Sequence, residues 1–150
     1  MSICSDSIQA VKLLCVDENK VTTIENLTTF HDYKGSELVI YLGGFSNHSK
    51  VELRKKFYHD IPALTFRHFG DIDFGGFSIL SHIRRETGIV IEALHMDTET
   101  LLKRKDLAKR PGANYIKKLG TLLHDNYLQD CKEIINYMIT HGVILEQETF

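Results

Sequence analysis

Alternation of strand-like and helix-like segments is the feature that most constrains the fold of this chain. The strand-like runs are short, rich in β-branched or aromatic residues, and stop at a glycine or an acidic residue. They are KVTTIEN (20–26), ELVIYLGG (37–44), PALTFRHFGD (62–71) and IVIEALHMD (89–97). Consecutive parallel strands need a crossover, which is usually a helix. The pattern therefore predicts an α/β fold, with a mostly parallel, Rossmann-like sheet of four strands and helices on both faces.

The segments around these strands carry expectations of their own. Residues 27–36 are turn-like, and the continuous apolar run of 37–44 predicts a strand that is buried on both faces. A helix is expected to begin with Thr98 as its cap, and two more helices are expected towards the end of the chain. Residues 1–16 are expected to be an N-terminal remnant or linker, and residues 17–150 one domain.

Acidic residues fall where three of the predicted strands end. Glu25 closes the first strand, Asp71 and Asp73 close the third, and Asp97 closes the fourth, while the second strand ends in two glycines. Ligands of open parallel sheets bind beyond the carboxyl ends of the strands, so we expect three or four carboxylates at one edge. An isolated Asp-x-Asp is more often a solvated turn. Its placement beside acids at other strand ends favours a functional site.

Clustered carboxylates define the chemistry that such an edge would perform. They repel each other unless their pKa values rise or a cation neutralises them. Oxygen ligands without nearby cysteine or paired histidine favour Mg²⁺ or Mn²⁺ over zinc or copper. Such an ion usually holds phosphate oxygens and activates a water or hydroxyl for attack. The sequence therefore predicts phosphoryl transfer or phosphodiester cleavage with Mg²⁺ or Mn²⁺ as cofactor.

Composition indicates in which cellular compartment the protein works and how it could contact DNA. The formal net charge of −2 and pI near 6.4 exclude a globally basic nucleic-acid coat, so DNA contact needs a local patch or bound cations. The three cysteines are odd in number and form no C-x-x-C pair, which argues against a disulfide framework or a zinc knuckle. With no signal sequence and no apolar run of membrane-spanning length, we expect a cytoplasmic protein without a membrane partner.

Ordered short motifs give the chain a family resemblance. TIEN, YLGG and GDIDFGG together resemble the Toprim domain shared by topoisomerases, primases and several nucleases. The longer phrases IENLTTF, YLGGF, HFGDIDFGGFSIL, HMDTETL and LEQE resemble the C-terminal Toprim domain of the JetD family. JetD is the nuclease subunit of the Wadjet anti-plasmid systems and is similar in design to the A subunit of type IIB topoisomerases. The resemblance covers residues 17–150.

The resemblance assigns roles to individual residues. It implies that Glu25, Asp71 and Asp73 are both the catalytic residues and the metal ligands, with Glu25 acting as a ligand or as general acid and base. Asp97 is expected in the outer shell of the site, and Glu146 and Glu148 of the LEQE phrase match a further family feature whose role is less defined. Resemblance to JetD implies hydrolysis of DNA by a metal-activated water.

Partners also follow from the resemblance. It implies DNA, other SMC-like Wadjet subunits and a homodimer formed through regions absent from this chain. Because related proteins carry an upstream winged-helix-like region, the chain is expected to be a fragment of a longer protein.

Two other functions stay open at this level. A topoisomerase-like transesterase would need a tyrosine from an upstream domain, since none of the tyrosines here matches the attacking one. A non-catalytic DNA-docking or assembly module would keep only a vestigial acidic site. The basic run KRKDLAKR (103–110) is either a DNA-backbone contact or a solvated helix face, and the second is favoured. His95 is the histidine placed where it could touch the site, although a structural role is favoured.

Overall fold

The core of the computed structural model, which describes residues 17–43 and 48–147, is an all-parallel sheet with the strand order β2-β1-β3-β4. The strands are β1 Lys20–Ile24, β2 Leu38–Tyr41, β3 Thr65–Phe69 and β4 Ile91–Ala93. The helices are α1 Leu27–Asp32, α2 His48–Asp60, α3 Phe74–Thr87, α4 Thr98–Lys103, α5 Ala113–Gly120 and α6 Lys132–His141. Four 3₁₀ turns complete the order: η2 Asp17–Asn19, η3 Lys105–Leu107, η4 Thr121–His124 and η5 Asn126–Cys131. The predicted α/β fold is confirmed.

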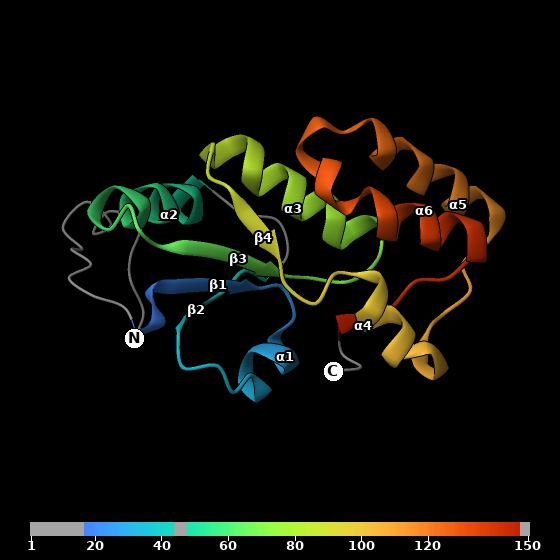
Figure 1. The fold of residues 1–150 in the computed structure, drawn as a ribbon, viewed down its shortest axis with the longest axis horizontal. Helices are drawn as coiled ribbons and strands as arrows, with labels where there is room; N and C mark the ends of the chain where they lie inside the picture. Colours follow the sequence, from blue (N-terminus) through green and yellow to red (C-terminus); the bar gives the residue numbers. More distant parts are fainter. Residues whose placement is uncertain (1–16, 44–47, 148–150) are drawn as a thin grey trace.

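Helices cover both faces of the sheet, as predicted. The chain moves outward from β1 to β2, and then crosses back over β1 to reach β3 and β4. Because such crossovers are right-handed, the reversal places α1 on one face and α2 and α3 on the other. Figure 1 shows α1 below the sheet and α2 and α3 above it. Helices α5 and α6 pack against each other, and the 3₁₀ turns between them contact α3.

The strand β2 is less buried than its sequence predicts. The expectation of a strand buried on both faces is wrong, because the residues of β2 are mostly half-buried and Tyr41 is 37% exposed. The reason is its position, since β2 is an edge strand with β1 on one side. A continuous apolar run indicates a strand near the core, but it does not reveal how many neighbours that strand has.

Three other segments differ from expectation in detail. The turn-like stretch 27–36 begins with the helix α1, because Asn26 Oδ1 accepts a hydrogen bond from the Thr29 N–H at 3.1 Å and caps it. The helix expected from Thr98 is confirmed only as far as Lys103, and its N-cap is Asp97. The two last helices are confirmed as α5 and α6, with 3₁₀ turns between them.

The expected N-terminal remnant, residues 1–16, is outside the described residues. Among the described helices, none has the length and apolar character needed to cross a membrane.

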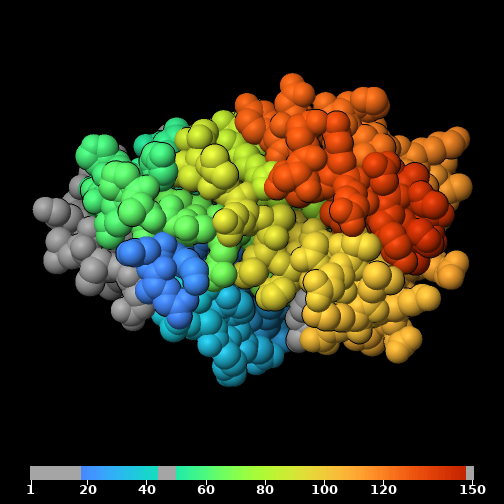
Figure 2. Space-filling view, viewed as in Figure 1, coloured from blue at the N-terminus to red at the C-terminus, as the bar shows by residue number. Residues whose placement is uncertain are grey.

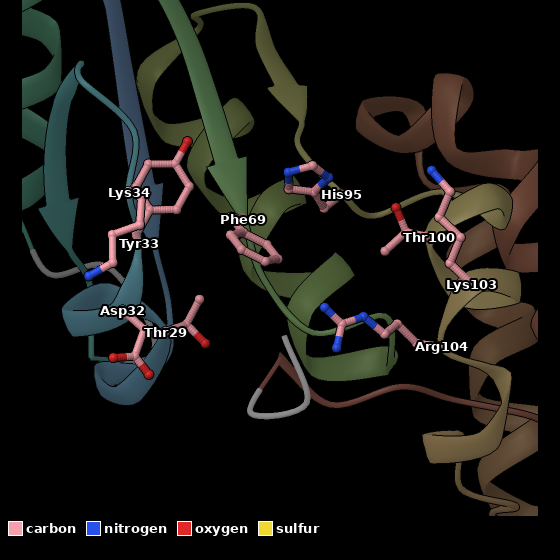
Figure 3. Close-up of a pocket in the computed structure, with 9 residues that line it drawn as sticks. All are labelled: Thr29, Asp32, Tyr33, Lys34, Phe69, His95, Thr100, Lys103 and Arg104. Carbon is pink, nitrogen blue, oxygen red and sulfur yellow. The ribbon is translucent and has the colours of Figure 1, made fainter.

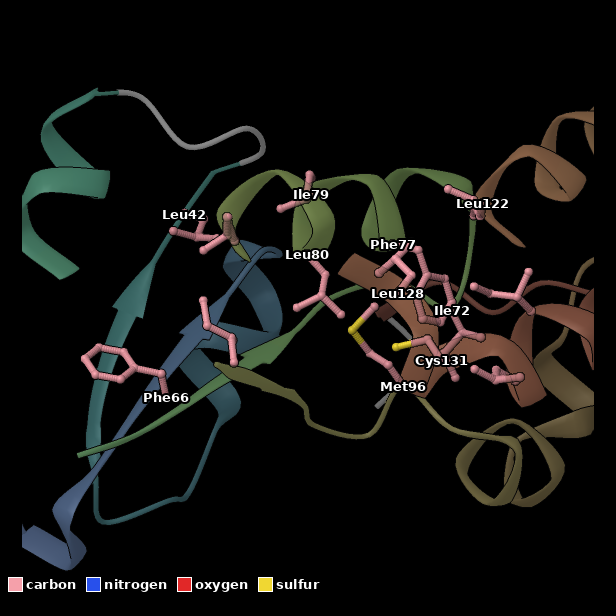
Figure 4. Close-up of a cluster of buried hydrophobic side chains, with 14 of the residues drawn as sticks. Leu42, Phe66, Ile72, Phe77, Ile79, Leu80, Met96, Leu122, Leu128 and Cys131 are labelled. Carbon is pink, nitrogen blue, oxygen red and sulfur yellow. The ribbon is translucent and has the colours of Figure 1, made fainter. Parts of the chain in front are cut away.

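One hydrophobic core joins the sheet to the C-terminal helices. Figure 4 shows Ile72, Phe77, Leu128 and Cys131 gathered between α3 and the start of α6. Ile72 is fully buried, and burying an isoleucine side chain contributes about 1.5–3 kcal/mol. Because Ile72 is the middle residue of the Asp-x-Asp sequence, its burial fixes the backbone from which both neighbouring aspartates project.

Candidate functional site

The candidate site lies at the point where the strand order of the sheet reverses. The central strands β1 and β3 are neighbours, and the connections from them lead to opposite faces of the sheet. Glu25 follows β1, while Asp71 and Asp73 follow β3. Such a switch point is where open α/β sheets bind ligands. The structure therefore brings together the three acids that were predicted to form the site.

Asp73 joins the site to α3 and to α5. Its side chain caps α3, because Oδ1 accepts a hydrogen bond from the Gly76 N–H at 2.8 Å. Its other oxygen, Oδ2, accepts a hydrogen bond from the Tyr115 hydroxyl at 3.0 Å. The same hydroxyl accepts a hydrogen bond from the Phe74 N–H at 3.1 Å. Asp73 is thus held in one orientation at the N-terminus of α3.

Asp71 is held by the end of the described chain. The backbone N–H of Gln147 donates to Asp71 Oδ1. Ile72, which follows Asp71, and Leu145, two residues before Gln147, exchange two backbone hydrogen bonds, at 2.8 and 3.0 Å, in an isolated antiparallel bridge. A glycine is required opposite this turn, because a Cβ on Gly76 would lie 2.1 Å from the Asp71 carbonyl oxygen.

Glu25 is the most strongly perturbed acid of the site. Burial is the largest cause, followed by the charges of Asp71 and Asp73, and together they raise the pKa of Glu25 to about 7. Its Oε2 atom is buried and has no hydrogen-bond partner within the described residues. A carboxylate in this environment exchanges a proton near neutral pH and gains from an electropositive partner.

A buried histidine, His68, lies close to Glu25 beside Gly70. His68 is fully buried, and its Nδ1 lies 3.0 Å from the hydroxyl of Thr23. Burial, followed by the charges of Arg54 and Arg84, lowers the pKa of His68 to about 3, so the ring is neutral. A Cβ on Gly70 would lie 2.7 Å from His68 Nε2 and 3.0 Å from Glu25 Oε2, so these two side chains can lie this close to the backbone only because residue 70 is a glycine.

Gln147 is a site residue that sequence reasoning missed. It is fully buried, its Oε1 accepts from the Asn26 N–H at 2.7 Å, and its Nε2 donates to the Phe69 carbonyl at 2.6 Å. It therefore joins the segments that follow β1 and β3, in addition to holding Asp71. The LEQE motif predicts a role for this segment, but it suggests the charged residues Glu146 and Glu148 and not the amide of Gln147 between them.

The remaining predicted site residues lie in different settings. Glu146 pairs with Lys109 at 2.6 Å, and Glu148 lies outside the described residues. Asp97 caps α4 through a 2.7 Å hydrogen bond from the Thr100 N–H, and it lines a pocket with other acids of β4, α4 and α6. His95 packs edge-on against Phe69, with ring centroids 5.3 Å apart.

The fit to a divalent cation depends on the donor set. In residues 17–43 and 48–147, no three His, Cys, Asp or Glu side chains converge as a ready-made metal cage. The acids of the site offer only hard oxygen atoms, and one of these, Glu25 Oε2, is buried without a partner. Mg²⁺ commonly uses one or two carboxylates and completes its shell with water and substrate phosphates. These residues therefore fit Mg²⁺ or Mn²⁺ better than they fit a closed structural site.

Fold and site together define an α/β domain with three electrostatically coupled carboxylates at the switch point of a parallel sheet. Sequence comparison supplies the family. The model of the family described as "Wadjet protein JetD, C-terminal" matches residues 1–150, and the chain belongs to that family. The Wadjet protein JetD of Bacillus cereus (strain Q1) is 28% identical over 151 residues, which cover 95% of this chain and 36% of that protein. The chain thus spans about a third of the length of this curated relative. The predicted resemblance to the JetD C-terminal domain is confirmed.

Proposed function

We propose that this chain is the Toprim-type catalytic domain of a Wadjet defence protein and hydrolyses DNA phosphodiesters with Mg²⁺ or Mn²⁺. The family membership supports a place in a Wadjet system. The acids at the switch point support the chemistry, because clustered oxygen ligands suit the hard cations that act on phosphates.

The environment of Glu25 is the observation that carries this proposal. A buried carboxylate oxygen without a hydrogen-bond partner is unfavourable, and two further carboxylates repel it. A fold that only needed stability would be served better by a neutral residue at this position. Positive charge, supplied by a cation, relieves both costs at once. Such an arrangement is expected of carboxylates that share a bound cation.

Each acid has a definite part in the proposed reaction. Asp71 and Asp73, which follow β3, are the metal ligands and are held in orientation by Gln147 and Tyr115. Glu25, which follows the neighbouring strand β1, completes the ligand set or takes the proton released by the attacking water. When bound, the ion supplies charge neutralisation for the phosphate oxygens and lowers the pKa of a bound water.

Tyr115 does not supply the nucleophile for a transesterase reaction. Burial and the charge of Asp73 raise the pKa of Tyr115 to about 12, so the hydroxyl stays protonated. It also donates to Asp73 and accepts from Phe74, which commits it to a structural role. We therefore expect Tyr115→Phe to reduce DNA cleavage without abolishing it, because Asp73 keeps its hydrogen bond from Gly76, and to give no protein–DNA adduct on a denaturing gel. A covalent adduct in the parent protein would favour the transesterase instead.

The partners of the full-length protein belong to the same proposal. DNA is the substrate, and other SMC-like Wadjet subunits, together with a second copy bound through regions absent here, are the expected assembly. Co-purification of the full-length protein with its Wadjet subunits, followed by mass measurement of the complex, tests this part separately from the chemistry.

The first experiment compares metal binding and cleavage in the same buffer. Calorimetry measures Mn²⁺ binding, and a supercoiled plasmid reports nicking. The informative variant carries Asp71→Asn and Asp73→Asn, because asparagine keeps the oxygen that accepts from Gln147 or Gly76 while removing the charge. Asp125→Asn is the matched control. Asp125 also caps a helical turn, accepting from the Tyr127 N–H at 2.8 Å, and it is not among the charges that raise the pKa of Glu25.

Two results separate catalysis from a docking role. Mn²⁺ binding and nicking that persist in Asp125→Asn and vanish in the double variant support the nuclease. Metal binding without nicking, under conditions in which DNA is bound, would make the acidic edge a vestigial site in a docking module. Equal metal binding by the double variant and the parent would show that Asp71 and Asp73 are not the metal ligands.

A further inference from the structure

A pocket of about 370 Å³ opens beside the acidic site, between α1 and α4. Phe69 lies beneath its floor, and His95 is at the back. One wall is lined by Thr29, Asp32, Tyr33 and Lys34, and the other by Thr100, Lys103 and Arg104. Figure 3 shows the guanidinium of Arg104 reaching toward the space in front of Phe69. In the space-filling view of Figure 2, α1 (light blue) and the α4 region (yellow) reach the same face of the molecule. The volume is within the range of small-ligand sites.

The pocket and the acidic site share their supports. Phe69 is the last residue of β3, and its carbonyl accepts hydrogen bonds from the Glu25 N–H and from Gln147. The Thr29 hydroxyl donates to the Gln147 carbonyl at 3.1 Å, while the Gln147 N–H holds Asp71. The two sites therefore lie next to each other on one edge of the sheet.

An exposed ring and cationic side chains characterise the pocket. Phe69 is only 3% exposed, so it supports the floor rather than offering a face. It packs edge-on against His95, whose ring is exposed and whose backbone adopts the left-handed conformation (φ 55°) between β4 and α4. Non-glycine residues adopt this conformation at a cost and cluster at functional sites. Arg104 and Lys103 add positive charge on the wall formed by α4, where Lys103 pairs with Glu99 at 2.6 Å. On the α1 side, Lys34 and Asp32 add one charge of each sign.

We infer that this pocket receives one unpaired nucleotide of the DNA strand to be cut, with its base against His95 and its phosphate against Arg104. The inference rests on the proposed nuclease function and narrows its substrate. A flat ring beside a guanidinium matches a base attached to a phosphate, because bases stack on rings and phosphates pair with arginine. A base within a duplex has both faces covered by its neighbours, so it must leave the stack to enter a recess. The enzyme therefore acts where a strand is unpaired or a nucleotide is extruded.

Fluorescence anisotropy in the presence of EDTA tests the pocket without the metal. The probes are a fluorescein-labelled oligothymidylate, its duplex with oligodeoxyadenylate, and unlabelled thymidine monophosphate as competitor. We expect the single strand to bind at least about tenfold more tightly than the duplex, since stacking and an arginine–phosphate contact are each of that size. Equal affinity for the single strand and the duplex, or no displacement of the labelled strand by excess thymidine monophosphate, overturns the inference.

Variants place the binding at the pocket. Arg104→Ala should weaken single-strand binding about tenfold, whereas Arg110→Ala, an exposed arginine of the same basic run outside the pocket, should change it less than about twofold. His95→Gly removes the ring while relaxing the left-handed backbone, so weaker binding by this variant cannot come from a strained fold. Equal losses in Arg104→Ala and Arg110→Ala would mean non-specific attraction and would overturn the inference.

The two proposals fail in different ways. The variant with Asp71→Asn and Asp73→Asn should bind the single strand in EDTA at least as well as the parent protein, because it loses negative charge beside the pocket. Nicking by the parent without preference for the single strand overturns the pocket alone. Preference for the single strand without any metal-dependent nicking overturns the nuclease and leaves strand binding in place.

Discussion

The backbone N–H of Gln147 donates a hydrogen bond to Oδ1 of Asp71, so the segment after α6 holds an acid that follows the central strand β3. Its side chain joins Asn26, after β1, to Phe69, at the end of β3. One residue therefore connects the two strands that carry the acids. The site depends on a contact between segments 76 residues apart in sequence.

Gln147→Ala should destabilise the fold and the site together. The Asn26 N–H and the Phe69 carbonyl would each lose a partner in a buried setting, and we expect the free energy of unfolding to fall by about 2–4 kcal/mol. Urea denaturation measures this loss. Gln129→Ala is the control, because Gln129 is exposed and makes one hydrogen bond, to the Asp125 carbonyl at 2.7 Å. A similar loss in both variants would contradict the role given to Gln147.

Gly76→Ala should displace α3 from the Asp-x-Asp turn. The added Cβ would meet backbone atoms of Asp71, the carbonyl oxygen at 2.1 Å and the nitrogen at 2.7 Å, and backbone cannot rotate away as a side chain can. We expect a loss of about 1–3 kcal/mol in unfolding free energy, together with weaker Mn²⁺ binding. Gly120→Ala, in α5, meets nothing within 4 Å and should be neutral or stabilising. Unaltered stability of Gly76→Ala would show that the turn adapts.

Much of this site was predictable because strand ends and turn residues are local signals. The apolar runs of β1 and β3 stop at acids, and parallel strands bring their carboxyl ends to one edge. That reasoning placed Glu25, Asp71 and Asp73 together. The strand order adds that β1 and β3 are neighbours in the sheet, which the sequence pattern alone does not reveal.

Features that depend on tertiary partners were not predictable in the same way. The edge position of β2 follows from the order of the sheet, and the role of Gln147 follows from partners far away in sequence. The composition of residues 27–36 favours a turn, because threonine, aspartate and glycine are common in loops, whereas the helix α1 is identified by its cap at Asn26. The pocket between α1 and α4 was not predictable for both reasons: it needs the helix α1, and it needs two helices that are far apart in sequence to lie side by side.

Glu25→Gln should stabilise the metal-free protein above neutral pH. The pKa of Glu25 is raised from 4.5 to about 7 in the folded protein. As the pH rises from 4.5 to 7, the unfolded chain therefore loses this proton more readily than the folded protein, and the free energy of unfolding falls. Relative to the parent, the variant should gain about 1–2 kcal/mol at about pH 8, allowing for solvent screening of this partly exposed group. The gain should disappear at about pH 4, where the parent carboxyl is protonated. Urea denaturation at both pH values measures it.

The matched control for Glu25 is Glu86→Gln, an exposed glutamate on α3. It should change the unfolding free energy by less than about 0.5 kcal/mol at either pH. If Glu25→Gln behaves in the same way, the buried, repelled carboxylate that carries the proposed function does not exist in solution.

Glu37→Gln should show the opposite pH dependence, because hydrogen bonds and, to a smaller extent, a cation stabilise this carboxylate. Burial raises the pKa of Glu37, but hydrogen bonds from Tyr33 and Thr22 and the charge of Arg67 outweigh it and lower the pKa to about 2. The ionised group therefore adds stability above its ordinary pKa of 4.5, and this stability is lost as the pH falls from 4.5 towards 2. The variant should be less stable than the parent at neutral pH, and the difference should shrink on acidification. Denaturation curves from neutral to about pH 3 measure this, and a difference that stays constant would show that the surroundings of Glu37 do not stabilise its ionised form.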